Sequence, residues 1–170
     1  MTRTYTVVDS PLGPLTLVWD PAGGPGHDGG ALAGCWVHDQ RERPASPVFG
    51  VEGSDPGLDA AAAQLAEYFA GTRRDFDVPL ASGTTPFGRD VAAALRAVPY
   101  GATTSYGELA AAVGRPKAAR AVGTVNARNP LSLFVPCHRV VPAGGAVVGD
   151  GEGARRKRWL QALEKDRGNR

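Results

Sequence analysis

The chain has few of the features that would tie it to a membrane, a disulfide framework or a metal. None of its apolar runs approaches the ~20 residues that cross a bilayer, and residues 1–5 contain no apolar signal core. Its two cysteines, Cys35 and Cys137, lie far apart in different surroundings. We therefore expect no membrane segment, no export, no disulfide, and a reducing, cytoplasmic location.

Metal-binding patterns are also scarce. In the N-terminal part, His27, Cys35 and His38 are the available cysteine and histidine ligands. They fall short of the closed ligand set of a structural metal site. We therefore expect no metal, and we interpret Cys35 as a buried strand residue.

Charge is unevenly distributed along the chain. Residues 1–114 hold 7 basic and 13 acidic side chains, whereas residues 115–170 hold 12 basic and 4 acidic side chains. A basic C-terminal part favours a polyanionic partner. A basic, solvated surface would give the same counts, so this alternative stays open.

The predicted elements divide the chain into residues 1–80 and residues 81–170. In the first part, alternating apolar residues and turn signals predict three strands and one helix, at residues 4–8, 14–19, 32–37 and 58–70. Two Pro/Gly-rich stretches, 21–30 and 41–57, read as loops. The fold class is therefore α+β, beginning with a small antiparallel sheet and its helix.

The second part is predicted to be mostly helical. Thr85 and Pro86 start one helix, and Ser105 with Glu108 forms a capping box for a short helix over residues 106–113. A second short helix, rich in Ala and Gly, is expected over residues 117–127. Two short helices joined by a tight turn form a candidate helix-turn-helix.

The segment Pro136–Val140 contains a cysteine directly before a histidine, between apolar residues. Only a thiolate attacks carbon, and a nearby base or positive field must lower the pKa of the thiol to produce it. We therefore interpret Cys137 as an activated nucleophile.

The same segment carries a resemblance to a known family. Arg120–Gly123, Asn129–Pro130 and Pro136–Val140, preceded by Ser105–Gly107, resemble the O6-alkylguanine–DNA alkyltransferases, and Asp9–Gly13 is similar to the start of that family's N-terminal domain. The resemblance covers nearly the whole chain. It implies a ribonuclease H-like N-terminal domain that supports a C-terminal domain with a winged-helix-like helix-turn-helix.

The resemblance also implies an activity. The family transfers an alkyl group from O6 of guanine to a cysteine, irreversibly and once per molecule, without a cofactor; O4-alkylthymine is an expected second substrate. The implied catalytic residues are Cys137 as acceptor, His138 and Glu164 in a glutamate–histidine–water–cysteine network, Tyr106 as a donor to N3 of the base, and Asn129 as support for the turn. Taken alone, Tyr106 could be a core residue and Glu164 a surface residue.

The implied partner is double-stranded DNA, bound through the minor groove by a monomer, with cooperative binding left open. Arg120 corresponds to the arginine that takes the place of the extruded nucleotide. The implied DNA-binding residues are Thr104, Ser105, Tyr106, Lys117, Ala119, Arg120, Gly123 and Arg128.

The implied substrate pocket consists of Val135, Pro136, Val148, Gly149, Asp150 and Gly151. The carbonyl of Val135 is expected to accept the exocyclic amine of guanine. Asp150 stands where the family commonly has a tyrosine, so the range of alkyl groups is the property most affected. Nearby, Arg155–Arg158 is expected to be a solvated face of the last helix, with Trp159, Leu160 and Leu163 packing inward.

Two other functions compete with this interpretation. A non-catalytic lesion-binding protein of the alkyltransferase-like kind would flip the base without accepting the alkyl group, but such proteins lack the cysteine. A cysteine hydrolase would use Cys137 with His138, although adjacent residues generally cannot be aimed at each other as that chemistry requires.

Overall fold

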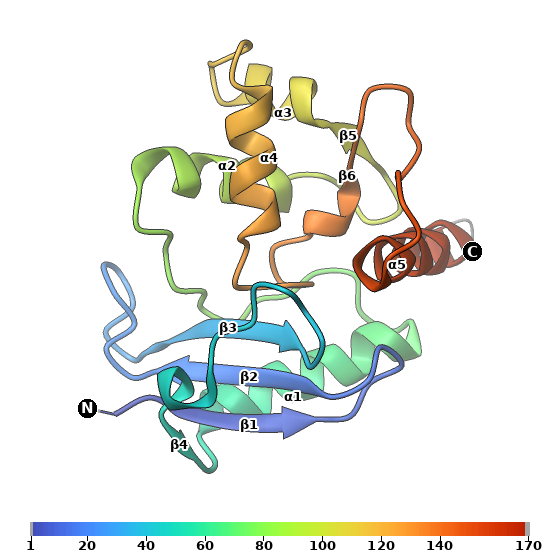
Figure 1. The fold of residues 1–170 in the computed structure, drawn as a ribbon. Coiled ribbons are helices and arrows are strands. Elements are labelled where there is room, and N and C mark those ends of the chain that lie inside the picture. Colours follow the sequence, from blue (N-terminus) through green and yellow to red (C-terminus); the bar gives the residue numbers. More distant parts are fainter. Residues whose placement is uncertain (1, 169–170) are drawn as a thin grey trace. The chain divides into compact units, whose positions relative to one another are not determined.

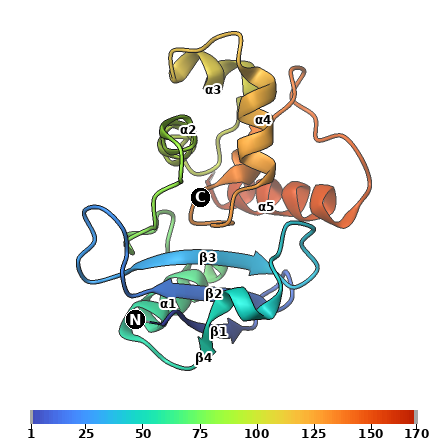
Figure 2. The same ribbon diagram turned by 60° about the vertical axis from the view of Figure 1, so that its left-hand side comes forward.

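The computed structural model describes residues 2–168, which form two compact units. The first contains the chain up to Ser82 together with Pro130–Phe134, and the second contains Gly83–Asn129 and the chain from Val135 onward. Figures 1 and 2 show a sheet with a helix in the first unit and a set of helices in the second. None of the described helices is long and apolar enough to cross a membrane.

A four-stranded sheet forms the first unit. Its strands are β1 (Thr4–Val8), β2 (Leu15–Asp20), β3 (Ala31–Val37) and β4 (Val51–Glu52), in the order β3-β2-β1-β4. The three predicted strands are confirmed, and they pair antiparallel. The short β4, which pairs parallel to β1, and a 3₁₀ turn at Ser46–Phe49 lie in the stretch expected to be a loop.

Helix α1 (Pro56–Ala70) covers one face of this sheet. Asp55 caps its start by accepting a hydrogen bond from the backbone N–H of Gly57, and Gly71 ends it in the left-handed conformation. Leu58, Ala61, Leu65 and Tyr68 recur at helical spacing and are all buried. This apolar stripe holds the helix on the sheet.

The segment Pro130–Phe134 returns to the first unit just before Cys137. The N–H of Cys35 donates to the carbonyl of Pro130 at 2.8 Å, and the N–H of Ser132 donates to the carbonyl of Cys35 at 3.2 Å. The segment therefore occupies the free edge of β3, where Cys35 is fully buried, as expected. From the sequence alone these five residues are expected in the C-terminal part, because no local pattern shows that they complete a distant sheet.

The second unit contains α2 (Pro86–Arg96), α3 (Tyr106–Ala112), α4 (Ala119–Ala127) and α5 (Glu152–Gly168), with the short parallel strands β5 (Thr104–Ser105) and β6 (Val140–Val141). Its two predicted helix starts are confirmed: Thr85 caps α2, and Ser105 with Glu108 forms a capping box on α3.

Helix α4 begins at Ala119, so the prediction that it starts at Lys117 is wrong. The N–H of Ala118 donates to the carbonyl of Arg115 at 2.9 Å, which closes a separate turn before the helix. Ala118 itself is outside helical geometry, with φ −98° and ψ 25°. Lys117 therefore lies in the exposed turn between α3 and α4.

Helix α5 packs differently from the expectation. Leu160 is buried as predicted, but Trp159 is 41% exposed and Leu163 is half-buried. Leu160 and Glu164 are one turn apart and form the buried stripe of the helix. Trp159 lies beside that stripe rather than on it.

Candidate active site

A tight turn presents Cys137. The residues Cys137–Arg139 form a 3₁₀ turn that leads into β6. The N–H of Cys137 donates to the carbonyl of Val135 at 2.7 Å, and the N–H of Arg139 donates to the carbonyl of Pro136 at 3.0 Å. As a result, Cys137 is half-buried, while His138 and Arg139 are buried behind it.

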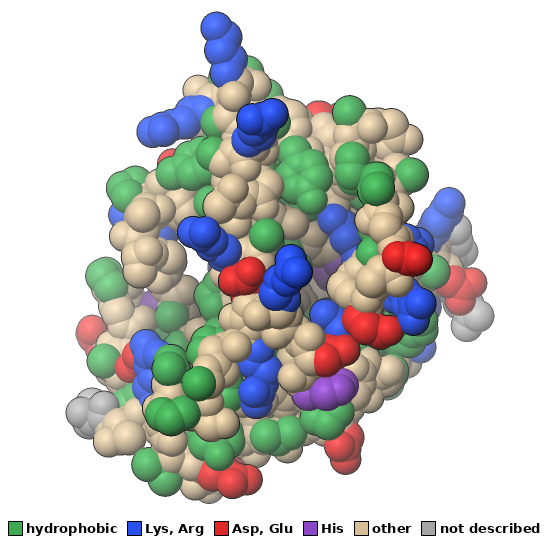
Figure 3. Space-filling model, viewed as in Figure 1, with side chains coloured by type: hydrophobic (Ala, Val, Ile, Leu, Met, Phe, Trp, Pro, Cys, Tyr) green, Lys and Arg blue, Asp and Glu red, His purple; other side chains and the backbone are tan. Residues whose placement is uncertain are grey.

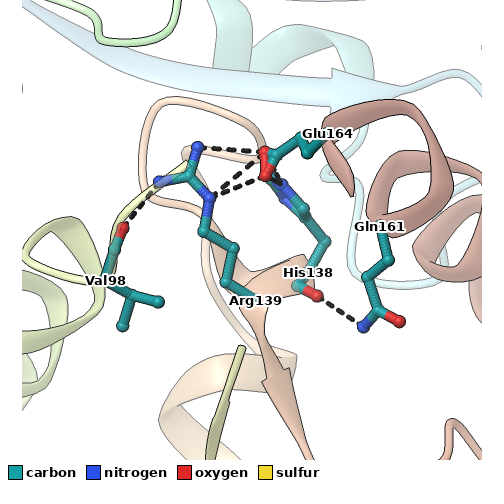
Figure 4. Close-up of polar contacts among 5 residues, drawn as sticks. All are labelled: Val98, His138, Arg139, Gln161 and Glu164. Atoms are coloured by element: carbon teal, nitrogen blue, oxygen red, sulfur yellow. Dashed lines mark hydrogen bonds and ion pairs between the residues drawn. The ribbon is translucent and has the colours of Figure 1, made fainter. Parts of the chain in front are cut away.

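His138 and Arg139 share the carboxylate of Glu164 on α5 (Figure 4). Nε2 of His138 lies 2.9 Å from both carboxylate oxygens. Nε and Nη2 of Arg139 donate to the two oxygens at 2.8 and 3.0 Å. The Glu164 side chain is thus buried with two partners, so it is not a surface residue.

These contacts determine the charges of the cluster. Burial alone would raise the pKa of Glu164, but hydrogen bonds from His138 and Arg139 hold it at about 2. Burial lowers the pKa of His138. The carboxylate of Glu164 raises this pKa, and the positive charge of Arg139 offsets part of that increase. The resting cluster is therefore a neutral imidazole beside an ion pair.

The tautomer of His138 follows from its partner. An ionised carboxylate only accepts hydrogen bonds, so Nε2 carries the hydrogen and Nδ1 carries the lone pair. Nδ1 is buried and has no hydrogen-bond partner among the described residues. His138 consequently offers one free basic nitrogen, with its ring orientation set by Glu164.

Arg139 is a site residue that the sequence analysis left without a role. Besides Glu164, its guanidinium donates to the carbonyl of Val98 at 2.8 Å and lies 5.7 Å from the ring centre of Tyr100. A signal was available, because an arginine that follows His138 and precedes two valines in an apolar segment requires an anionic partner if it is buried. Only the structure shows that this partner is the one His138 uses.

Asn129 contacts the turn that presents Cys137. Its Nδ2 donates to the carbonyl of Val135 at 2.9 Å, and its side chain lowers the pKa of Cys137. The carbonyl of Val135 therefore accepts two hydrogen bonds, from Asn129 and from the N–H of Cys137. These two hydrogen bonds occupy both lone pairs of the Val135 oxygen. The exocyclic amine of guanine, which this oxygen is predicted to accept, would therefore compete with them.

The pKa of Cys137 is shifted in the direction opposite to the expectation. Burial raises it, while the hydrogen bond from Asn129 and the positive charges of Lys157 and Arg156 lower it by less. In the free protein, the effect of burial on this pKa thus exceeds that of the nearby positive charges. Cys137 rests as a thiol, and its activation requires transfer of its proton to a base.

Tyr106 begins α3 and is half-buried. Burial and the proximity of Cys137 raise the pKa of its phenol, so the hydroxyl keeps its hydrogen at neutral pH. Nζ of Lys157 lies 5.7 Å from the centre of its ring. Lys157 was expected on a solvated face, but its side chain is half-buried and burial lowers its pKa.

Helix α4 exposes a narrow face of small residues and arginines. Arg120, Thr124 and Ala127, at helical spacing, are exposed, and so is Arg128 at the end of the helix. Figure 3 shows Lys and Arg side chains projecting around the turn between α3 and α4. The exposed face of α4 is therefore positively charged and carries mostly small side chains.

Four of the predicted DNA-binding residues, Thr104, Ser105, Ala119 and Gly123, are only partly exposed. The hydroxyl of Thr104 donates to Glu108 at 2.9 Å, and the hydroxyl of Ser105 accepts from the N–H of Glu108 at 3.0 Å. Both hydroxyls therefore serve the capping box. Ala119 and Gly123 are half-buried on α4, where their small size keeps the helix surface low.

The predicted pocket loop is exposed. Val148, Gly149, Asp150 and Gly151 all lie at the surface, with Val148 79% exposed. Nη1 of Arg158 on α5 donates to the carbonyl of Gly149 at 2.7 Å and anchors the loop to that helix. Pro136, in contrast, is buried behind Cys137. No group of three or more His, Cys, Asp or Glu side chains within residues 2–168 could hold a metal ion.

Comparison with known proteins identifies the family. The sequence model of the 6-O-methylguanine DNA methyltransferase DNA-binding domain matches residues 86–166. A methylated-DNA–protein-cysteine methyltransferase of Mycobacterium tuberculosis, strain H37Rv, is 44% identical over 164 residues, which is 96% of this chain and 93% of that protein. The chain belongs to the methylated-DNA–protein-cysteine methyltransferase family.

Solved structures of the family share the fold. The crystal structure of the M. tuberculosis O6-methylguanine methyltransferase matches with a TM-score of 0.81 and 43% identity, covering 97% of this chain and 94% of that chain. The M. tuberculosis protein OGT in complex with DNA matches with a TM-score of 0.79 and 44% identity, covering 96% and 94%. The α+β fold class is therefore confirmed for the chain as a member of this methyltransferase family.

Proposed function

We propose that this chain repairs alkylated DNA directly, by transferring the alkyl group of O6-alkylguanine to Cys137, once per protein molecule. The observation that carries the proposal is the placement of a half-buried thiol directly before a buried, neutral histidine whose tautomer is set by Glu164. Membership of the methylated-DNA–protein-cysteine methyltransferase family supports the same reaction.

The first step activates the thiol. Nδ1 of His138 takes the proton of Cys137 through a water molecule, and Glu164 stabilises the imidazolium that forms. Lys157 and Arg156 then stabilise the thiolate, because their positive charges lower the pKa of Cys137. The burial that keeps the resting thiol protonated also leaves the thiolate poorly solvated and therefore reactive.

The second step transfers the alkyl group. A sulfur lone pair forms the S–C bond while the bond between that carbon and O6 breaks, and the released electron pair enters the guanine ring. Tyr106 donates its hydroxyl to N3 of the base as this negative charge develops. One proton has left the thiol and one ends on guanine, so the products are S-alkylcysteine and guanine. The thioether is stable, which makes the protein single-turnover.

DNA would be bound through the outer face of α4. Its small residues suit the narrow minor groove, and Arg120 would occupy the space left by the extruded nucleotide. Lys117 and Arg128, both exposed, would contact phosphates. Thr104 and Ser105 would contribute chiefly by capping α3 at the edge of this surface.

The resemblance to the alkyltransferase family also supports assignments for the two domains, a second substrate, the oligomeric state and the location. The helix pair α3–α4 would act as a winged-helix-like helix-turn-helix. Residues 1–80 would form a ribonuclease H-like supporting domain, and residues 81–170 would form the DNA-binding domain. O4-alkylthymine would be a second substrate, with the loop containing Asp150 beside the alkyl group. The protein would act as a monomer in the cytoplasm, where a free Cys137 thiol persists.

The decisive experiment weighs the intact protein after incubation with a duplex oligonucleotide containing O6-methylguanine. We expect one methyl-sized mass gain that stops at one per protein, with none in Cys137→Ser and an unchanged gain in Cys35→Ser. Binding without a mass gain would favour a lesion-binding protein. Repeated turnover of an ester substrate would favour a hydrolase.

A further inference from the structure

One side of α5 carries three polar side chains that contact the active site. Lys157, Gln161 and Glu164 follow one another at spacings of four and three residues, so they lie along the same side of the helix. Glu164 binds the ring of His138, and Nζ of Lys157 lies 5.7 Å from the ring centre of Tyr106. Gln161 lies between them, and neither the sequence nor the proposed reaction assigns it a role.

Gln161 contacts the backbone of the turn that presents Cys137. Its Nε2 donates to the carbonyl of His138 at 2.8 Å (Figure 4). The direction of this hydrogen bond is unambiguous, because a backbone carbonyl only accepts. Carbonyls at the end of a helical turn have no donor within that turn, and Gln161 supplies one to the 3₁₀ turn Cys137–Arg139.

His138 is consequently held by α5 at two points. Glu164 lies 2.9 Å from Nε2 of the ring, and Gln161 binds the carbonyl of the same residue. The first contact sets the orientation of the imidazole, and the second sets the position of the backbone that carries it. Because Cys137 is bonded directly to His138, the contact with the carbonyl also restrains the thiol relative to Nδ1 of the ring.

The contact made by Gln161 is separate from the buried charges. Gln161 is half-buried, whereas His138 and Glu164 are almost completely buried. The ion pair between Arg139 and Glu164 does not use Gln161. A substitution of Gln161 can therefore release the turn while the buried charges stay paired.

We propose that Gln161 is a positioning residue for alkyl transfer: by donating to the carbonyl of His138, it holds the turn so that the thiol of Cys137 stays aligned with the basic nitrogen of the imidazole. The inference rests on the proposed function, in which His138 takes the proton of Cys137 through a water molecule. Transfer of a proton between two side chains depends on their alignment, and small displacements in such a site are costly.

The test follows single-turnover transfer from an O6-methylguanine duplex. It determines the rate constant at saturating DNA, the half-saturating DNA concentration and the final methylated fraction. We expect Gln161→Met, of similar length but without a donor, to lower the rate constant about three- to tenfold, as for the loss of one hydrogen bond. The other two quantities should not change. Ala162→Met, at the next, exposed position of α5, is the matched control and should react like the wild type.

Gln161→Glu separates hydrogen-bond donation from shape. A carboxylate has nearly the same shape as the amide but only accepts hydrogen bonds, so it cannot bind the carbonyl of His138. We expect this variant to react at least as slowly at pH 8 as Gln161→Met. A rate constant equal to that of the wild type would show that the donated hydrogen bond has no part in transfer and would overturn the proposal.

A purely structural role predicts a different pattern. A substitution that only destabilised the fold would lower the final methylated fraction and leave the rate constant of the folded molecules unchanged. One that only disturbed the DNA-binding surface would raise the half-saturating DNA concentration at an unchanged rate constant. Either pattern in Gln161→Met would overturn the proposal.

A double-mutant cycle locates the effect at His138. The variant His138→Asn keeps the backbone carbonyl but lacks the base, so adding Gln161→Met to it should have little further effect on the rate constant. An equal fold loss in both backgrounds would show that Gln161 acts by another route, contrary to the proposal.

Alkylation of Cys137 by iodoacetamide tests the positioning without DNA. Gln161→Met should slow this reaction at neutral pH, because the thiol then loses its proton to a less well aligned His138. An unchanged alkylation rate would overturn the proposal. If the wild type gains no methyl mass from the duplex, the proposed function fails, a result distinct from an active wild type with an unimpaired Gln161→Met.

Discussion

Nε2 of His138 lies 2.9 Å from both oxygens of Glu164, inside a cluster where each side chain is almost completely buried. The adjacent Arg139 holds the same carboxylate through Nε and Nη2. The carboxylate is therefore neutralised by a permanent cation before His138 acquires a proton. This arrangement keeps the imidazole neutral at rest while it still supports the imidazolium during the reaction.

Replacing Glu164 by Gln should impair both stability and transfer. The amide would leave the Arg139 cation buried without its counter-ion, and the free energy of unfolding should fall by about 3–5 kcal/mol. The transfer rate should fall at least tenfold, because a neutral amide supports the His138 imidazolium poorly. Urea denaturation and single-turnover kinetics measure the two effects. Glu108→Gln, at the exposed capping box, is the matched control and should lose much less stability.

Stability should fall in acid in two stages. Burial lowers the pKa of His138 below its ordinary 6.5, so stability declines as the pH falls below that value and the unfolded chain takes up a proton. Glu164 has a folded pKa of about 2 against 4.5 unfolded, and its contribution of about 3 kcal/mol is present above pH 4.5 and lost between pH 4.5 and 2.

Urea midpoints measured from pH 8 to pH 3 check these two stages. In Glu164→Gln, the decrease in the free energy of unfolding below pH 4.5 should be much smaller than in the wild type. An unchanged acid profile in that variant would contradict the assignment of this stage to Glu164.

Removing the charge of Lys157 should make Cys137 less reactive. The ammonium lowers the pKa of the thiol, so Lys157→Met should raise that pKa and slow alkylation of Cys137 by iodoacetamide at neutral pH. Arg155→Met is a matched control on the same helix, since Arg155 is exposed and pairs with Glu152. Equal slowing in both variants would point to a general effect of net charge instead.

Arg120 should matter more when the damaged nucleotide is hard to extrude. If its side chain fills the vacated space, Arg120→Ala should slow transfer from a fully paired duplex by more than tenfold. Transfer from a single-stranded oligonucleotide should slow by less than about threefold. The two substrates differ because extrusion of the nucleotide costs a few kcal/mol only in the duplex. Arg128→Ala, which removes a neighbouring positive charge, should weaken binding to both substrates similarly. Equal losses on the two substrates in Arg120→Ala would argue against this role.

The sequence allowed much of the fold to be predicted because the signals were local. Thr85, Ser105 with Glu108, and Gly71 mark helix ends through contacts within a few residues. Alternation in residues 4–8 and 32–37 predicted the strands. The strand β4 could not be foreseen, because a two-residue pairing depends on the neighbouring strand rather than on its own composition.

The candidate site was only partly predictable for the same reason. The Pro136–Val140 segment and its resemblance indicated Cys137, His138 and Glu164. The sharing of Glu164 by Arg139 and the contact of Lys157 with Tyr106 join elements far apart in the chain. No spacing rule shows these contacts, and the direction of the pKa shift of Cys137 depends on burial that the sequence does not reveal.

The central claim is that Cys137 is the alkyl acceptor, and it is tested most directly by locating the transferred group. After reaction with a duplex carrying O6-methylguanine, the protein is digested and its two cysteine-containing peptides are examined by tandem mass spectrometry. We predict S-methylcysteine at Cys137 in one copy per molecule, with Cys35, fully buried at the edge of β3, unmodified. A methyl group on Cys35, or an unmodified Cys137 in protein that has repaired the DNA, would contradict the account.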